Sequence, residues 1–246
     1  MVADMTRSEI RVNGEIVLLD RSGAAFVAAY RTLVFADLHF EKGSAYARRG
    51  ALIPPYDTRA TMRRMEEAIA RLQPASVVAL GDSFHDGDAA HRLDAEERAT
   101  LLRLTARHDW LWVEGNHDPK PPGWLGGRVG GEIALGALIL RHLPSGARGE
   151  IAGHLHPCVT VNRRGLSVRR RCFATDGASL LMPAFGAYAG GLDIGDVAVT
   201  SLFADGFAVH ALGHERVYCV SAQPARRKTS EEIHPNIRAI NTVETP

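Results

Sequence analysis

The stretch SVVALGDSFHDGDAAHRLDAEERATLLRLTARHDWLWVEGNHD, residues 76–118, decides the fold class of this chain. It begins with an apolar run, SVVAL, and ends with a second one, WLWV, and polar residues follow each run. Between them, DAEERATLLRLTAR predicts an amphipathic helix with Asp94 as its N-cap. A strand, a helix and a second strand in this order predict a parallel crossover unit.

The same alternation extends toward the N-terminus. RTLVFAD, residues 31–37, predicts another strand, and residues 54–74 predict a helix with Asp57 or Thr58 as its cap. Before them, Asn13-Gly14 lies between alternating flanks, which is a strong hairpin signal. The N-terminal half therefore predicts a largely parallel sheet with crossover helices.

Beyond residue 130 the helical signal fades, and short strand candidates follow one another. They are ALILRH (137–142), GEIAGH (149–154), LSVRRRCFA (166–174), SLLMPAF (179–185), FAVHA (207–211) and RVYCV (216–220). The sequence thus predicts an α/β (α+β) domain over residues 1–220. Residues 221–246 are polar, and we expect a mobile or loosely docked tail there.

Composition excludes several classes of protein. Hydrophobic residues make up 46% of the 246 residues and charged residues 23%, which is typical of a globular domain. The net charge of +1 gives no global attraction to nucleic acid or membrane, so any basic surface has to be local. The three cysteines are widely spaced, which argues against a disulfide framework and favours the cytoplasm. No apolar run is long enough to predict a membrane span.

Polar side chains follow five of the predicted strands, where α/β sheets bind their ligands. They are Asp37, His39, Asp82, Asn116, His142, His154 and His156. Any one of these short motifs is as typical of an ordinary turn as of a metal site. Five such motifs at five successive strand ends are not typical of ordinary turns. Seven oxygen and nitrogen donors suit two divalent cations, and their mixture favours Mn, with Fe, Zn or Mg as alternatives. The glycines before them, Gly81, Gly115 and Gly153, are expected to let the backbone turn sharply.

The order D-x-H, GD, GNHD, H and GHxH resembles the calcineurin-like metallophosphoesterases over roughly residues 30–160. The resemblance implies a β-sandwich flanked by helices and two metal ions bridged by Asp82. One ion would take Asp37, His39 and His156. The other would take Asn116, His142 and His154.

His117 and Asp118 complete the GNHD motif. The resemblance implies that His117 binds no metal and instead serves as proton donor or charge stabiliser at the leaving group. Asp118 would orient it.

A second resemblance, to the ligase-associated DNA damage response endonuclease family PdeM, extends from about residue 10 to about residue 220. It depends on FADLHFEKGSAYARRGALIPPYDTRATM, GHLHP, RRRCF and LMPAFGAYAGGL. It implies metal-dependent cleavage of DNA or RNA, a role in DNA repair, and a ligase or helicase partner. A small-molecule phosphatase, a nucleotide pyrophosphohydrolase and a non-catalytic scaffold are the alternatives.

Five further residues are candidate substrate contacts: His85, Arg48, Arg49, Arg169 and Arg171. Arginine suits phosphate because its planar donor fork is always charged. For each residue the alternative is structural: a loop histidine, a solvated arginine pair, or an ordinary charged hairpin across residues 162–172. Likewise, residues 182–191, MPAFGAYAGG, either wall the site or form a structural turn.

Overall fold

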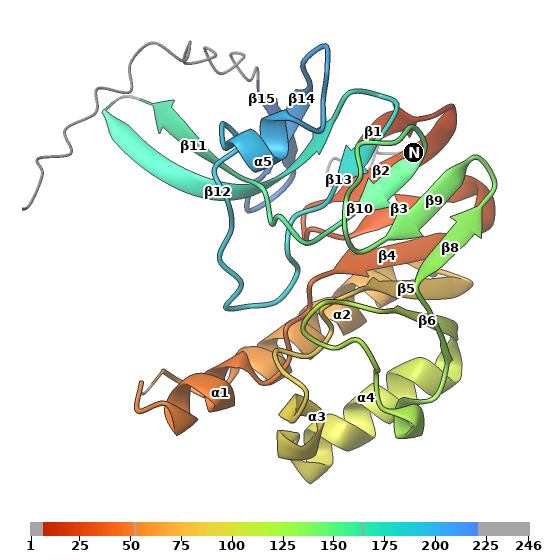
Figure 1. Cartoon of the computed structure of the whole chain (residues 1–246), viewed down its shortest axis with the longest axis vertical. Coiled ribbons are helices and arrows are strands. Elements are labelled where there is room, and N and C mark those ends of the chain that lie inside the picture. Colours follow the sequence, from red (N-terminus) through yellow and green to blue (C-terminus); the bar gives the residue numbers. More distant parts are fainter. Residues whose placement is uncertain (1–6, 52, 164, 221–246) are drawn as a thin grey trace, which may run out of the picture.

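The computed structural model describes residues 7–51, 53–163 and 165–220. Two mixed β-sheets pack against each other, and the long helices cover the outer face of one of them (Figure 1). This confirms the predicted metallophosphoesterase-type sandwich. The predicted tail, residues 221–246, lies outside the described residues. Within the described residues, no helix is long and apolar enough to cross a membrane.

The first sheet has seven strands that lie side by side in chain order. They are β1 (Arg7–Val12), β2 (Glu15–Asp20), β3 (Ala25–Val27), β4 (Thr32–Ala36), β5 (Ser76–Leu80), β6 (Asp109–Val113) and β7 (Arg128–Gly130). Strands β1 to β4 are antiparallel, and β4 to β7 are parallel. Asn13 and Gly14 form the predicted hairpin turn, both with positive φ (47° and 90°).

The helices connect the parallel strands. They are α1 (Lys42–Arg48), α2 (Asp57–Leu72), α3 (Ala89–Arg92) and α4 (Ala95–Arg107), with the 3₁₀ turn η2 (Gly123–Leu125) before β7. A second 3₁₀ turn, η1 (Ala28–Tyr30), lies between the antiparallel strands β3 and β4. The predicted cap of α4 is confirmed, because Asp94 and Glu97 form a reciprocal capping box.

The predicted cap of α2 is wrong. The helix begins at Asp57 with no side-chain cap. The Asp57 carboxylate instead accepts a hydrogen bond from the backbone N–H of Gly43, and Thr58 binds the backbone N–H and the carboxylate of Glu41. Both side chains are used to fix the start of α1, which the sequence did not predict.

The second sheet has the order β15-β14-β12-β13-β10-β9-β8, with β11 paired to the outer half of β12. The strands are β8 (Glu132–Leu135), β9 (Leu138–Arg141), β10 (Glu150–Ala152), β11 (Cys158–Arg163), β12 (Leu166–Thr175), β13 (Leu180–Leu181), β14 (Ala208–Leu212) and β15 (Val217–Val220). A short helix, α5 (Val197–Thr200), lies between β13 and β14. The β11–β12 hairpin projects from the sandwich on the same side as α1 (Figure 1).

Two apolar layers hold the sandwich together. Val34, Val78 and Leu140 belong to the layer between the two sheets. Phe35, Met65 and Trp110 belong to the layer between the first sheet and its helices. Successive residues of β4 therefore face different cores, which follows from the two-residue period of a strand. Because the first sheet is packed on both faces, its strands are held in place and the residues that follow them have fixed positions.

Candidate metal centre

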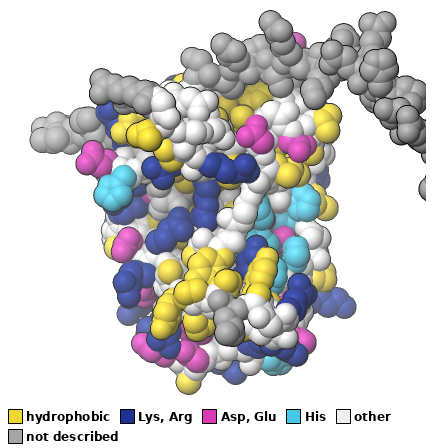
Figure 2. All heavy atoms as spheres, turned by 90° about the vertical axis from the view of Figure 1, so that its left-hand side faces the viewer, with side chains coloured by type: hydrophobic (Ala, Val, Ile, Leu, Met, Phe, Trp, Pro, Cys, Tyr) yellow, Lys and Arg dark blue, Asp and Glu magenta, His cyan; other side chains and the backbone are white. Residues whose placement is uncertain are grey.

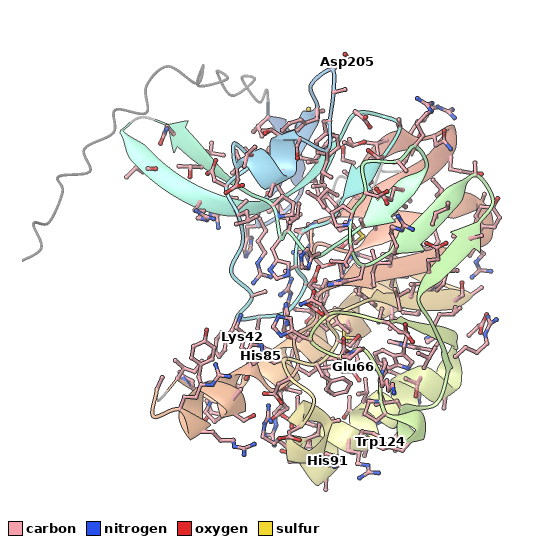
Figure 3. All side chains as sticks on the ribbon, viewed as in Figure 1. Lys42, Glu66, His85, His91, Trp124 and Asp205 are labelled. Carbon is pink, nitrogen blue, oxygen red and sulfur yellow. The ribbon has the colours of Figure 1, made fainter. Side chains whose placement is uncertain are left out.

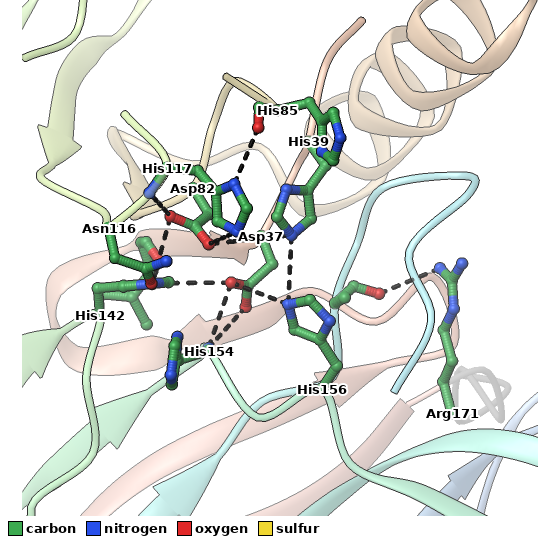
Figure 4. A network of polar contacts seen from close by, with 12 residues as sticks. Asp37, His39, Asp82, His85, Asn116, His117, His142, His154, His156 and Arg171 are labelled. Atoms are coloured by element: carbon green, nitrogen blue, oxygen red, sulfur yellow. Dashed lines mark hydrogen bonds and ion pairs between the residues drawn. The ribbon is translucent and has the colours of Figure 1, made fainter. Parts of the chain in front are cut away.

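All seven predicted metal ligands lie at one edge of the sandwich, where strands of both sheets end (Figure 4). The first sheet supplies the residues that follow β4, β5 and β6. The second supplies His142 after β9 and the two histidines after β10. The site therefore forms at the junction of the two sheets.

The first group of potential ligands is Asp37, His39 and His156. The Nε2 atoms of His39 and His156 face each other at 3.3 Å, and an Asp37 carboxylate oxygen lies 3.1 Å from Nε2 of His156. Burial, with the neighbouring His156 as a second cause, lowers the pKa of His39 to about 3. His39 is therefore neutral, as a metal-ligating imidazole has to be.

The second group is Asp82, His142 and His154, with Asn116 beside it. Nε2 of His142 lies 2.9 Å from the side-chain oxygen of Asn116 and 3.4 Å from Oδ1 of Asp82. Nδ1 of His142 is held by the carbonyl oxygen of Leu80 at 3.2 Å, which leaves Nε2 to face the site.

Asp82, a member of the second group, also faces the first group. Oδ1 faces His142, and Oδ2 lies 4.0 Å from Nε2 of His39 in the first group. Burial opposes ionisation of Asp82, but hydrogen bonds from His142 and from the His117 backbone N–H hold its pKa at about 2. A carboxylate in this position can touch a cation in each group.

The charges at this edge fit two cations. The side chains of Asp37 and Asp82 are 0% and 3% exposed, and their ion-pair partners among the described residues are all histidines. An ionised carboxylate that is buried without a lysine or arginine partner costs folding free energy unless a metal ion compensates its charge. The donor set of carboxylates, imidazoles and an amide oxygen suits divalent cations of the Mn, Fe or Zn type.

The backbone at these ligands is unusual. Asp37, His39, Asp82, His154 and His156 all have positive φ, between 44° and 69°. Positive φ is uncommon for residues other than glycine, and it concentrates at functional sites. The turns that aim the ligands are thus built from the ligand residues themselves.

Of the three glycines that precede the ligands, only Gly81 has the positive φ expected of a sharp turn, and Gly115 and Gly153 are required for a different reason. Gly81 does have positive φ (70°), as predicted. A Cβ on Gly115, however, would lie 2.1 Å from the backbone nitrogen of Asp82, and one on Gly153 would lie 2.5 Å from Oδ2 of Asp37. These two positions are glycine because the carboxylates pack directly against the backbone.

His117 lies outside both groups. Its Nδ1 donates to the carbonyl oxygen of His85 at 2.9 Å, and its Nε2 lies 3.9 Å from Oδ2 of Asp82. The expected hydrogen bond to Asp118 is not among the contacts of the described residues. Oδ2 of Asp118 accepts from the backbone N–H of Phe84 instead, and burial raises the pKa of Asp118 to about 7. The carbonyl of His85 replaces Asp118 as the group that orients His117.

Three rings extend outward from the centre. His117 stacks on His85 at 5.6 Å between ring centroids, and His85 stacks on Tyr46 of α1 at 6.1 Å. Lys42, the first residue of α1, lies close to His85 (Figure 3). Tyr46 and Lys42 were not among the predicted site residues, although both lie in the FADLHFEKGSAYARR segment that contains the first metal motif.

The candidate substrate arginines fall into two places. Arg48 and Arg49 line an open hollow of about 490 Å³ beside α1 and α3, and neither guanidinium has a hydrogen bond or ion pair among the described residues. Arg171 is placed differently from expectation, because it donates to the carbonyl oxygens of residues 184, 185, 187 and 189. Arg169 donates to the carbonyl of Gly191. These two arginines therefore hold the 182–191 loop beside the site.

Figure 2 shows histidine side chains gathered in a recess on the face that carries α1, with lysine and arginine side chains around it. A cationic rim beside a histidine-lined recess suits an anionic substrate.

Comparisons with known proteins agree with this geometry. Residues 30–168 match the family described as calcineurin-like phosphoesterase, which is more than half of the chain. Nuclease MPE from Pseudomonas putida is similar in structure, with a TM-score of 0.68 and 26% identity over 87% of this chain and 100% of that one. The phosphoesterase Yfce from E. coli shares 16% identity over 77% of this chain and 97% of its own, at a TM-score of 0.40. Comparison with curated protein sequences finds no match.

The matched region, residues 30–168, contains all seven potential ligands as well as His117. The family match, the two ligand groups and the shared carboxylate together account for the clustering of histidines at the junction of the sheets. The chain belongs to the calcineurin-like phosphoesterase family and is a metal-dependent phosphoesterase with a site for two divalent cations.

Proposed function

We propose that this phosphoesterase hydrolyses phosphodiester bonds of nucleic acid, as an endonuclease that works in DNA repair and uses Mn²⁺. The observation that carries the proposal is the position of His117. Its Nε2 faces the shared carboxylate of Asp82 but belongs to neither ligand group. That is the place for a group that acts on the substrate.

In this proposal each cation has its own ligands. Asp37, His39 and His156 would hold one, Asn116, His142 and His154 would hold the other, and Asp82 would be the ligand common to both. When bound, two such cations lower the pKa of a water molecule and neutralise the charge that develops on the phosphate.

His117 then acts on the leaving group. Its Nδ1–H is committed to the carbonyl of His85, so an imidazolium carries its second proton on Nε2. As the bond between phosphorus and the leaving oxygen breaks, Nε2–H donates that proton to the oxygen. The alkoxide leaves as an alcohol, and His117 becomes neutral.

Nucleic acid as the substrate is supported by local charge and by similarity. The net charge of the chain is only +1, yet Arg48 and Arg49 at the end of α1 line a hollow beside the site. The similar structure from Pseudomonas putida is named a nuclease. Membership of the PdeM family, a ligase or helicase partner and a cytoplasmic location belong to the same proposal and rest on the sequence resemblance.

The test is a comparison of rates on four substrates with Mn²⁺ and after chelation. Single-stranded DNA and bis-p-nitrophenyl phosphate should be hydrolysed faster than p-nitrophenyl phosphate, a monoester. Faster hydrolysis of p-nitrophenyl phosphate or of 2′,3′-cyclic nucleotides would favour a small-molecule phosphatase or nucleotide hydrolase instead. A chain that binds no metal and hydrolyses none of the four would be a scaffold.

A further inference from the structure

The hollow beside α1 lies on the His117 side of the site, which is where the leaving group lies in the proposed function. His117 is the first ring of the stack, and the protonated leaving oxygen has to lie beside it. From there the rings of His85 and Tyr46 continue in near-parallel planes, at 19° and 22°. The chain of rings ends on α1, two residues before Arg48.

The outermost ring is available to a ligand. Tyr46 is 39% exposed, and its hydroxyl has no hydrogen bond among the contacts of the described residues. One face of its ring is directed to His85. An exposed aromatic ring beside a phosphate-cleaving centre is the kind of platform on which an unpaired base stacks.

The hollow carries an excess of positive charge. It is lined by Ala45, Arg48, Arg49, Asp86, Gly87, Asp88 and Arg92. Asp86 and Arg92 neutralise each other through two hydrogen bonds of 2.8 Å. Two arginines then face one remaining carboxylate, that of Asp88. A volume of about 490 Å³ is in the range that ligand sites occupy.

The competing explanation is a solvated arginine pair that stabilises α1. Arg92 already does this, because it donates to the hydroxyl of Ser44 and to the backbone carbonyl of Glu41. Arg48 and Arg49 make no such contact within the described ranges, so the fold does not use their guanidinium groups. Unused donor forks in a concave surface next to the site suit phosphate recognition.

We infer that Tyr46, Arg48 and Arg49 form a subsite for the nucleotides on the leaving-group side of the cleaved bond, in a single-stranded nucleic acid. An unpaired base stacks on Tyr46, and the next phosphates along the strand bind the two arginines. The inference rests on the proposed function, since it takes nucleic acid as the substrate and His117 as the proton donor.

Binding of a fluorescein-labelled single-stranded 12-mer, measured by anisotropy in chelator, tests the subsite without cleavage. The double variant Arg48→Ala/Arg49→Ala should raise Kd about 10-fold or more. It should also reduce the slope of log Kd against log salt by about 0.7 for each phosphate that an arginine no longer neutralises. Tyr46→Ala should raise Kd about 10-fold with an unchanged slope, because stacking releases no counterions. Arg107→Ala removes an exposed arginine at the end of α4 and is the matched control.

A second measurement gives the direction of the strand. Diester substrates are lengthened by three nucleotides either on the leaving-group side or on the opposite side. Lengthening the leaving-group side should lower KM for the unmodified enzyme and much less for the double variant. Lengthening the opposite side should affect both proteins alike.

Each failure has its own signature. A double variant that binds the 12-mer within twofold of the unmodified chain, or a KM that responds only to the opposite side, would overturn the subsite. If binding depends on the arginines but no diester is cleaved with Mn²⁺, the proposed function fails and the leaving-group assignment fails with it, while the two arginines and Tyr46 remain a nucleic-acid binding surface. Circular dichroism and thermal midpoints confirm that every variant is folded.

Discussion

Replacing His117 by alanine tests the chemistry of the site most directly. The ring contributes no ligand to either group, so both metal ions should remain bound. Loss of a general acid typically costs about 10²–10⁴-fold in rate. Because the His117 side chain is 43% exposed, water can reach the leaving oxygen in its place. We therefore expect the lower end of the range, about 100-fold, for DNA.

The leaving group provides the internal control. A nitrophenolate departs without a proton, so hydrolysis of bis-p-nitrophenyl phosphate by His117→Ala should fall less than about 10-fold. His91 is an exposed histidine on α3, away from the site, and His91→Ala should change neither rate (Figure 3).

The assay combines metal content with turnover. Metal is measured by plasma emission on the purified proteins, and kcat is measured with both substrates at saturating Mn²⁺. A His117→Ala protein that has lost a metal ion would refute the role given to this residue. So would an equal loss of kcat on DNA and on the nitrophenyl diester.

Three further predictions concern metal, packing and pH. Asp82→Ala should leave the protein folded, and metal analysis should find neither ion bound to it. Mn²⁺ added at 100 times its Kd should raise the free energy of unfolding of the unmodified chain by about 2.7 kcal/mol per site. The free energy of unfolding of the variant should not change with Mn²⁺. Gly115→Ala should lower the free energy of unfolding in urea by about 1–3 kcal/mol, because its Cβ would lie 2.1 Å from the Asp82 nitrogen; an unchanged urea midpoint would contradict this packing. Hydrogen bonds from Arg92 lower the pKa of Asp86, so the pair stabilises the fold above the ordinary carboxyl pKa and loses this effect as the pH falls through the lowered one. The difference in urea midpoint between the unmodified chain and Arg92→Ala should therefore shrink from pH 7 to pH 3, and a difference that grows would be evidence against the pair.

The strand ends made the site predictable. Each ligand follows the end of a short, continuous apolar run, and parallel strands bring such ends to one edge whatever the loops between them do. Helix α4 was equally readable, because its capping box is a local signal between Asp94 and Glu97. Both features are determined by residues that are close in the sequence.

What the sequence did not reveal depends on distant contacts or on backbone atoms. Helix α1 is seven residues long and contains Gly43, whose N–H is held by Asp57 from the next helix. A helix this short is not stable by its own propensity. The group that orients His117 is a main-chain carbonyl, which every residue possesses, so no residue type marks it.

The placement of ligands on both sheets has a consequence for folding kinetics. His39 and His156 meet across 117 residues of chain, and Asp37 accepts the backbone N–H of His154 across the same interval. Neither three-residue group can assemble while the sheets are apart, since each draws on both of them. Metal capture should therefore come after the sheets have docked, and metal release should require that docking to loosen. The dissociation rate of Mn²⁺ would then report how often the sandwich opens at this edge.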